Sequence, residues 1–152
     1  PATFAPAMVV PRRGHRAELM PDGSVLMIGG VDAAGAPVRT LERFAIDAGF
    51  VPVGELPPSA GVVDITTTQL PDGRILIIGG RTALDGPAVD TALIARLDLV
   101  DGSVDVVQTD RLATARAGHV AVTLCDGTVW VSGGSAGAPA AERYNPPPTG
   151  RR

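Results

Sequence analysis

The chain has 152 residues, a formal net charge of −3 and one cysteine, and 45% of its residues are hydrophobic. Its 19 Gly and 14 Pro make up about a fifth of the chain, against roughly 12% in ordinary globular proteins. This composition excludes a disordered linker, an internal disulfide, a cysteine-built zinc site and the basic surface of a nucleic-acid-binding protein, and no apolar run approaches the roughly 18 residues that span a bilayer.

The first ten residues lack the charged start and the long apolar centre of a signal peptide. The compartment therefore stays open, with an extracytoplasmic location (periplasmic or secreted) favoured over the cytoplasm. Residues 3–8 instead have the character of a β-strand that leads into Arg12. We interpret residues 1–11 as an outer strand that completes a sheet other than the one that follows it.

Three segments of the chain resemble one another: residues 15–30, 65–80 and 119–134. Each contains an Asp-Gly pair and ends in a Gly-Gly pair, and both markers are spaced by 50 and then by 54 residues. Chance similarity would not keep two independent markers at the same offsets. The chain is therefore predicted to be a repeat protein.

Each repeat predicts a β-hairpin followed by further strands. The first strand ends at the Asp-Gly pair, which is typical of tight turns that need positive φ. The returning strands are apolar and comprise residues 25–28, 75–78 and 129–131. A third strand is predicted within residues 41–44, 93–99 and 141–144, and a fourth within residues 50–54 and 103–109.

A strand that is apolar on both sides must be covered on both faces. In an antiparallel meander, this requires a sheet on either side of each sheet, whereas a two-layer sandwich would show alternation. Four antiparallel strands in each repeat of 50 or so residues, stacked radially, form the blade of a β-propeller. The predicted fold class is therefore all-β, with blades at residues 12–58, 59–112 and 113–152, of which the last lacks its fourth strand.

The motif Arg-x-x-His, then Leu-x-Asp-Gly-x-Val-x-x-x-Gly-Gly, then Glu-Arg-Phe/Tyr resembles the kelch repeat in the form common in bacterial proteins. The matching residues are Arg12 with His15, Arg116 with His119, the three Gly-Gly pairs, Glu42-Arg43-Phe44 and Glu142-Arg143-Tyr144. The middle repeat departs from this motif, with Val62 and Ile65 in place of Arg and His. The usual fourth-strand Trp is also absent, with Phe4 and Phe50 as its replacements.

Three blades are too few for a closed propeller, which has roughly four to eight. A wedge of three would leave two apolar faces and an unpaired edge in water. Two completions are open. A second copy would give a six-bladed dimer, in which each N-terminal strand closes the last blade of the other copy; alternatively, these residues belong to a longer propeller chain.

His15 and His119 hold equivalent positions at the start of the innermost strands. Convergent imidazoles bind metals, but Ile65 holds the same position in the middle repeat and no acidic or Cys partner recurs beside them. A structural role without metal is therefore favoured. Arg12 and Arg116 are expected to pair with carboxylates across blades, for example with Glu42 or Glu142.

The remaining polar residues of the repeats give no catalytic pattern. Asp22, Asp72 and Asp126 belong to the turns by composition, and one blade separates each from the next, which excludes a carboxylate dyad. Cys125 stands where the other repeats have a turn Pro, and we interpret it as an inert thiol.

The resemblance implies carbohydrate chemistry as the enzyme alternative, because the kelch fold hosts a copper radical oxidase and a sialic-acid isomerase. That oxidase needs a Tyr pair and a Cys cross-linked to Tyr, whereas this chain has one Tyr and one Cys. We therefore expect no catalysis and no cofactor.

The expected function is a non-catalytic module for protein binding or assembly, which uses loops on a rigid scaffold. Its partner would be a protein or a second copy of the chain, with no nucleic acid and no membrane span, and a carbohydrate-binding or carbohydrate-active propeller is the alternative. The candidate binding residues are charged and lie in the loops at one rim: Arg12, Arg13, Asp32, Arg39, Arg81, Asp85, Asp90 and Arg116.

Overall fold

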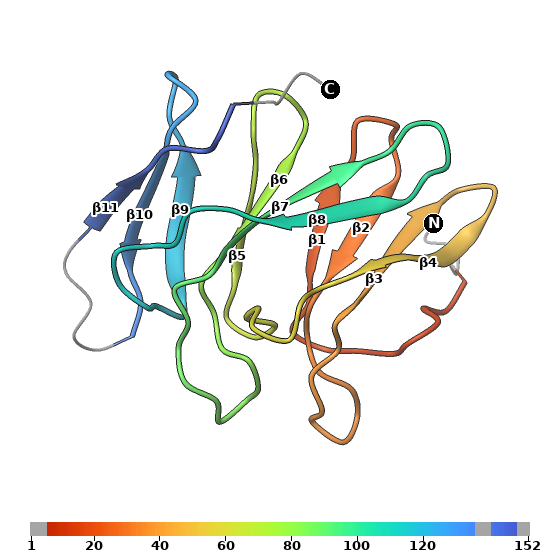
Figure 1. The fold of residues 1–152 in the computed structure, drawn as a ribbon. Coiled ribbons are helices and arrows are strands. Elements are labelled where there is room, and N and C mark those ends of the chain that lie inside the picture. Colours follow the sequence, from red (N-terminus) through yellow and green to blue (C-terminus); the bar gives the residue numbers. More distant parts are fainter. Residues whose placement is uncertain (1–5, 136–140, 149–152) are drawn as a thin grey trace, which may run out of the picture.

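The computed structural model describes residues 6–135 and 141–148, and all regular secondary structure in these ranges is β-strand. Three antiparallel sheets follow one another along the chain, and within each sheet consecutive strands pair. We call these sheets blade 1, blade 2 and blade 3 (Figure 1). The described ranges contain no helix that would be long and apolar enough to cross a membrane. The predicted all-β class of stacked antiparallel sheets is confirmed.

Blade 1 consists of β1 (Arg16–Leu19), β2 (Val25–Ile28), β3 (Thr40–Ala45) and β4 (Gly49–Glu55). Blade 2 consists of β5 (Thr66–Gln69), β6 (Ile75–Ile78), β7 (Ala92–Leu97) and β8 (Val104–Gln108). In the described ranges, blade 3 consists of β9 (His119–Thr123), β10 (Val129–Gly133) and β11 (Ala141–Tyr144). The innermost strands contact one another in series, β1 with β5 and β5 with β9, so the blades stack side by side (Figure 1).

Half of the strand predicted over residues 3–8 lies outside the described residues. Residues 3–5 lie outside the described ranges, and residues 6–8 belong to no strand. In the described part of blade 3, β11 pairs only with β10, so the outer edge of this sheet is open.

The Asp-Gly pairs form the turns between the first and second strands of each blade. In the first turn, Gly23 has a φ of 83°, and Asp22 Oδ1 accepts hydrogen bonds from Ser24 N (3.0 Å) and Ser24 Oγ (2.6 Å). The hydrogen bond from the Ser24 hydroxyl is the main reason that the pKa of Asp22 is lowered. Asp126 accepts the same pair of bonds from Thr128 (3.0 and 2.6 Å). The predicted turn role of these aspartates is confirmed.

The core lies between the blades rather than within one sheet. Every residue of β6 is at most 2% exposed. Ile75 and Ile77 pack into the cluster between blades 1 and 2, whereas Leu76 and Ile78 pack into the cluster between blades 2 and 3. The apolar second strand is thus covered on both faces, as its composition predicts.

Candidate functional site

The loops that follow the first two Gly-Gly pairs carry most of the predicted binding residues and extend from the side of the molecule opposite the Asp-Gly turns (Figure 1). Arg13 and Asp85 are exposed. Asp32 is half-buried and its Oδ1 accepts hydrogen bonds from two backbone amides of its own loop (2.9 and 2.8 Å). A small hollow of about 170 Å³ brings Asp32 together with Arg12 and Arg13. Asp85 is not part of this hollow.

Three further candidates make polar contacts within the chain. Arg39 Nη1 donates to Ala60 O (3.2 Å), and so connects blade 1 to the segment that leads into blade 2. Arg81 Nη1 donates to a carbonyl of its own loop (2.9 Å). Asp90 forms an ion pair with Arg111 at 2.7 Å. These side chains support the loops in which they lie.

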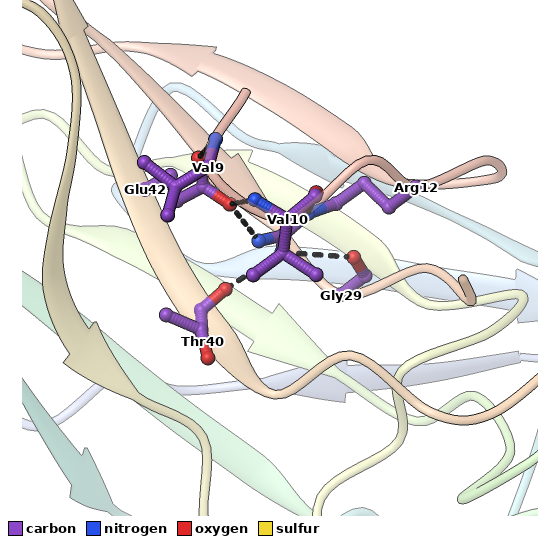
Figure 2. A network of polar contacts seen from close by, with 6 residues as sticks. All are labelled: Val9, Val10, Arg12, Gly29, Thr40 and Glu42. Atoms are coloured by element: carbon purple, nitrogen blue, oxygen red, sulfur yellow. Dashed lines mark hydrogen bonds and ion pairs between the residues drawn. The ribbon is translucent and has the colours of Figure 1, made fainter. Parts of the chain in front are cut away.

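Arg12 is buried and forms an ion pair with Glu42, and both side chains have no exposed surface (Figure 2). Glu42 also accepts hydrogen bonds from the amides of Val9 (2.7 Å) and Val10 (3.0 Å). Arg12 donates in addition to the carbonyls of Thr40 (2.6 Å) and Gly29 (3.4 Å) (Figure 2). This network joins the segment before blade 1 to β2 and β3.

Arg116 repeats this arrangement in blade 3. Its Nη2 lies 2.8 Å from Glu142 Oε1, and the Arg116 side chain is fully buried. The sequence predicts pairing across blades, and the structure corrects this: each pair joins the connection into a blade to the third strand of that same blade. Because both guanidinium groups are buried, Arg12 and Arg116 do not lie on the exposed rim expected for binding residues.

The equivalent positions in blade 2 hold an apolar pair, Val62 and Leu93. They are 0% and 1% exposed and lie in the same core cluster. Replacing a buried ion pair by packed apolar side chains is often neutral or stabilising, since no charge has to be desolvated. The departure of the middle repeat from the motif is therefore a coordinated exchange of both partners.

The innermost strands line a groove of about 450 Å³. Its lining residues are His15, Arg16, Ala17, Glu18, Thr66, Thr67, His119, Val120 and Ala121. Several of the polar groups are already bonded between blades. Arg16 Nε donates to Ile65 O (2.9 Å), and the Thr67 hydroxyl donates to the Glu18 carboxylate. The groove is polar, but much of its hydrogen-bonding capacity joins the strands to one another.

His119 in this groove is 4% exposed, and its Nε2 lies 2.8 Å from Thr66 Oγ1 of blade 2. Burial, and next the charge of Arg116, lower the pKa of His119 to about 4. The imidazole is therefore neutral near pH 7. Among the described residues, no group of three or more His, Cys, Asp or Glu side chains is placed to hold a metal ion. These contacts support a structural role for His119.

The face of blade 3 that points away from blade 2 carries three exposed apolar side chains. Val120 is 60%, Val122 is 57% and Trp130 is 46% exposed. They share one face because Val122 is the direct partner of Trp130 in the β9–β10 register and Val120 lies two residues along β9. We call this surface, with Gly133 and Gly134 at its end, the open face of blade 3.

The positions equivalent to Trp130 are buried in the other blades. Leu26 in blade 1 and Leu76 in blade 2 are both 0% exposed, because each packs against the next blade. The open face of blade 3 therefore has the build of an interblade face but has no blade against it in the described part of the chain. Contiguous exposed apolar patches of this kind mark interaction sites.

The Gly-Gly pairs also differ between blades 1 and 2, which contact a following blade, and blade 3, which does not in the described ranges. Gly30 N donates to Val62 O (2.6 Å), and Gly80 N donates to Arg116 O (2.8 Å), each in the segment that leads into the next blade. A Cβ on Gly29 would lie 2.6 Å from Val62 O, so this close approach requires glycine. In blade 3, by contrast, Gly133 and Gly134 are exposed, and a Cβ on Gly133 would meet no described residue within 4 Å.

Blade 1 also has a face without a neighbouring sheet in the described ranges. In the strand registers, Ala17 and Leu19 on β1 share this face with Val25 on β2 and Phe44 on β3. Ala17 and Leu19 are exposed, whereas Val25 and Phe44 are half-buried. The row of blades therefore has an apolar surface at both of its ends. We call this second surface the open face of blade 1.

Reasoning from the sequence misses Val120, Val122 and Trp130 as site residues. The available signal is the alignment of the repeats, which places the single Trp of the chain at a position held by Leu in the other two. Charged loop residues are selected instead, because charge is a common sign of an exposed position.

No family model matches the chain, and no curated protein matches it. Among solved structures, the chain is similar to the structure of YjhT, with a TM-score of 0.63 and 16% sequence identity over 80% of this chain and 43% of that chain. It is also similar to a novel fungal alcohol oxidase of the AA5 family in complex with copper, with a TM-score of 0.48 and 16% identity over 91% of this chain and 42% of that chain.

At these identities the similarity concerns the fold alone. The first of these neighbours is a propeller structure, which agrees with the stacked antiparallel sheets described above. The chain spans less than half the length of either neighbour.

Proposed function

We propose that this chain is a kelch-type β-propeller segment that works as a non-catalytic binding and assembly module through protein–protein contact. The observation that carries this proposal is the open face of blade 3, where Trp130 is 46% exposed although its equivalents, Leu26 and Leu76, are fully buried. Complete burial of a large apolar side chain contributes about 1.5–3 kcal/mol. A partner that covers Val120, Val122 and Trp130 together would therefore gain a binding free energy of several times RT.

The edge of blade 3 adds a second reason. Within the described ranges, β11 pairs only with β10, so it presents a row of backbone donors and acceptors. Open edges favour strand addition from another protein segment. An apolar face next to an open edge is the arrangement expected of a surface that another protein covers.

Photo-crosslinking tests this proposal directly. A photoreactive phenylalanine analogue would replace Val122 on the open face in cells that make the protein, with a matched variant at Val100, which is 96% exposed but lies in the β7–β8 turn. Protein adducts that form from position 122 well above the level from position 100 support the proposal. If position 122 gives no more adduct than position 100, this face is not a protein interface in the cell.

Carbohydrate binding is the second candidate function, and the polar groove of about 450 Å³ on the innermost strands favours it. Titration with galactose and with N-acetylneuraminic acid distinguishes the two functions, with the NMR signals of the His15 and His119 rings as the readout. A module that binds only proteins gives no saturable change in these chemical shifts. Saturable shifts in both rings would move the assignment to a carbohydrate-binding propeller.

A further inference from the structure

We infer that the open face of blade 3 is covered by the open face of blade 1 from a second copy of this chain. This inference rests on the proposed assembly function and names its partner. The described ranges of each chain contain three sheets, so these parts of two copies, joined head to tail, would give six blades, within the range of roughly four to eight in which propellers close. The ring would contain two identical interfaces, each between blade 3 of one copy and blade 1 of the other.

The backbone at the two ends is complementary. In the first two Gly-Gly pairs, the second glycine donates its amide to a carbonyl of the segment that leads into the next blade, as Gly80 does to Arg116. Gly134 N in blade 3 is the donor equivalent to Gly30 N and Gly80 N. Arg12 O, before blade 1, is the acceptor equivalent to Val62 O and Arg116 O. Within the described residues, neither of these two groups has a hydrogen-bond partner. A second copy supplies each with the partner that the repeat calls for.

The side chains at the two ends are complementary as well. Leu76, the equivalent of Trp130, lies in one cluster with Val129 and Tyr144 of the next blade. The residues of blade 1 in those two positions are Val25 and Phe44, both half-buried. Trp130 would therefore pack on an aliphatic and an aromatic side chain, which are favourable partners for an indole ring.

A polar interblade contact is replaced by an apolar one at the new interface. Between blades 1 and 2, the Glu18 carboxylate accepts a hydrogen bond from the Thr67 hydroxyl. The equivalent positions at the proposed interface are Val122 and Ala17, and both are exposed in the single chain. At this pair of positions, no charged group is left opposite an apolar one.

A face-to-face dimer of two blade 3 surfaces does not offer the same match. It would place Gly134 amides near each other without acceptors, and it would leave the open face of blade 1 in water. A head-to-tail contact whose rotation closes after two copies satisfies both ends and leaves no free face.

Sedimentation and fluorescence of the purified 152-residue chain test the inference. Because Trp130 is the single tryptophan, its emission reports on the open face of blade 3 alone. We expect a dimer, and we expect Trp130 emission to move to shorter wavelength and to become protected from acrylamide as the dimer forms. A chain that stays monomeric at every concentration, or one that grows into open polymers, overturns the inference.

Gly133→Ala is a variant aimed at the interface alone. Its Cβ would meet nothing within 4 Å among the described residues of its own chain, but the position of Gly29 against Val62 O indicates that it would lie against Arg12 O of the second copy. Gly118→Ala is the matched control, because Gly118 has a similar φ (65° against 72°) and free space, and Asp64 occupies its equivalent position in blade 2 with a φ of 54°. We expect loss of the dimer in the first variant and retention in the second. Retention in both contradicts the inference.

A mixing experiment fixes the orientation. Trp130→Glu disables one face and Ala17→Glu the other, so each variant alone should be monomeric. A mixture restores one intact interface, and the Trp130 emission of the Ala17→Glu chain should then shift to shorter wavelength. An Ala17→Glu chain that remains dimeric would indicate a face-to-face dimer and exclude the head-to-tail ring.

The crosslinking experiment separates the two proposals. Adducts from position 122 with twice the mass of the chain agree with both. Adducts with a different protein, together with a monomeric purified chain, overturn the second-copy inference and leave the assembly function in place. Absence of adducts together with a monomeric chain overturns both.

Discussion

His119 and Gly79 are in direct contact across the boundary between blades 2 and 3. A Cβ placed on Gly79 would lie 2.6 Å from His119 Cε1 and would also overlap the carbonyl oxygen of Arg116. Gly79 has a φ of 60°. The glycine is therefore required both by its backbone conformation and by the close approach of the neighbouring blade.

We predict that Gly79→Ala destabilises the chain by about 3 kcal/mol or more, because a backbone carbonyl and a buried ring must both move. Gly118→Ala, at a φ of 65° and with nothing within 4 Å of its Cβ, should lose only about 1 kcal/mol from left-handed strain. Urea unfolding of both variants measures the difference. Equal losses of unfolding free energy in the two variants would show that the close contact of Gly79 with blade 3 does not contribute to stability.

The burial of His119 predicts a pH-dependent stability. In the unfolded chain its pKa is near 6.5, whereas in the folded chain it is about 4, so the unfolded state binds the proton more readily between these values. The stability contributed by the neutral ring is complete above pH 6.5 and is lost as the pH falls towards 4. We expect a loss of about 3 kcal/mol over this window.

His119→Ile is the matched variant for this measurement, since Ile65 holds the equivalent position in blade 2. The free energy of unfolding is measured for both proteins at a series of pH values. The wild-type chain should lose stability relative to the variant below pH 6.5, and parallel curves would show that His119 is not the titrating group.

The buried pair of Arg12 and Glu42 predicts strong coupling. Arg12→Val or Glu42→Leu alone should cost about 3–5 kcal/mol, because each leaves an unpaired buried charge. The double variant, which reproduces Val62 and Leu93 of blade 2, should cost only about 1–2 kcal/mol, mainly because the Val9 and Val10 amides lose their acceptor.

A double-mutant cycle measured by urea unfolding gives the coupling energy. The exposed pair of Asp90 and Arg111, with side-chain exposures of 35% and 55%, is the control and should show less than about 1 kcal/mol. Additive losses at Arg12 and Glu42 would show that the two buried charges do not stabilise each other.

Tyr144 predicts a smaller effect across the same boundary as His119. Its hydroxyl lies 3.0 Å from Thr109 Oγ1 at the end of blade 2. Tyr144→Phe, which installs the ring found at Phe44 in blade 1, should cost about 1 kcal/mol. In a Thr109→Val background, Tyr144→Phe should leave the free energy of unfolding almost unchanged. The same loss of about 1 kcal/mol in that background would show that the Tyr144 hydroxyl stabilises the fold through a group other than Thr109.

The sequence is sufficient to predict the parts of this fold that depend on local chemistry. The turn at Asp22 follows from the Asp-Gly pair, and the double-sided burial of Ile75–Ile78 follows from a run without polar residues. The sequence also gives Glu42 and Glu142 as candidate partners of Arg12 and Arg116. It wrongly expects these ion pairs to lie across blades, because the path of the connection into a strand is set by packing.

The open face of blade 3 is hidden from the sequence for a related reason. Trp130 has the apolar character of Leu26 and Leu76, and only the three-dimensional order of the blades shows that its surface is uncovered. The charged loop residues predicted to bind a partner show the opposite problem, because their sequence suggests free side chains where the structure shows contacts. Asp32 and Arg39 are charged and lie in loops, but their hydrogen bonds within the chain become visible only when the backbone around them is placed.

The burial of β6 on both faces has a consequence for how the chain opens. Since its side chains interlock with the sheets on either side, β6 cannot lose its order until one of those neighbours has detached. In the single chain, amide protons on β6 should therefore exchange with deuterium last, whereas those on β9 and β11, at the end of the row, should exchange early. Unfolding is thus expected to begin at the end blades and not at β6. A single blade separated from its neighbours would lose part of the packing that keeps it folded.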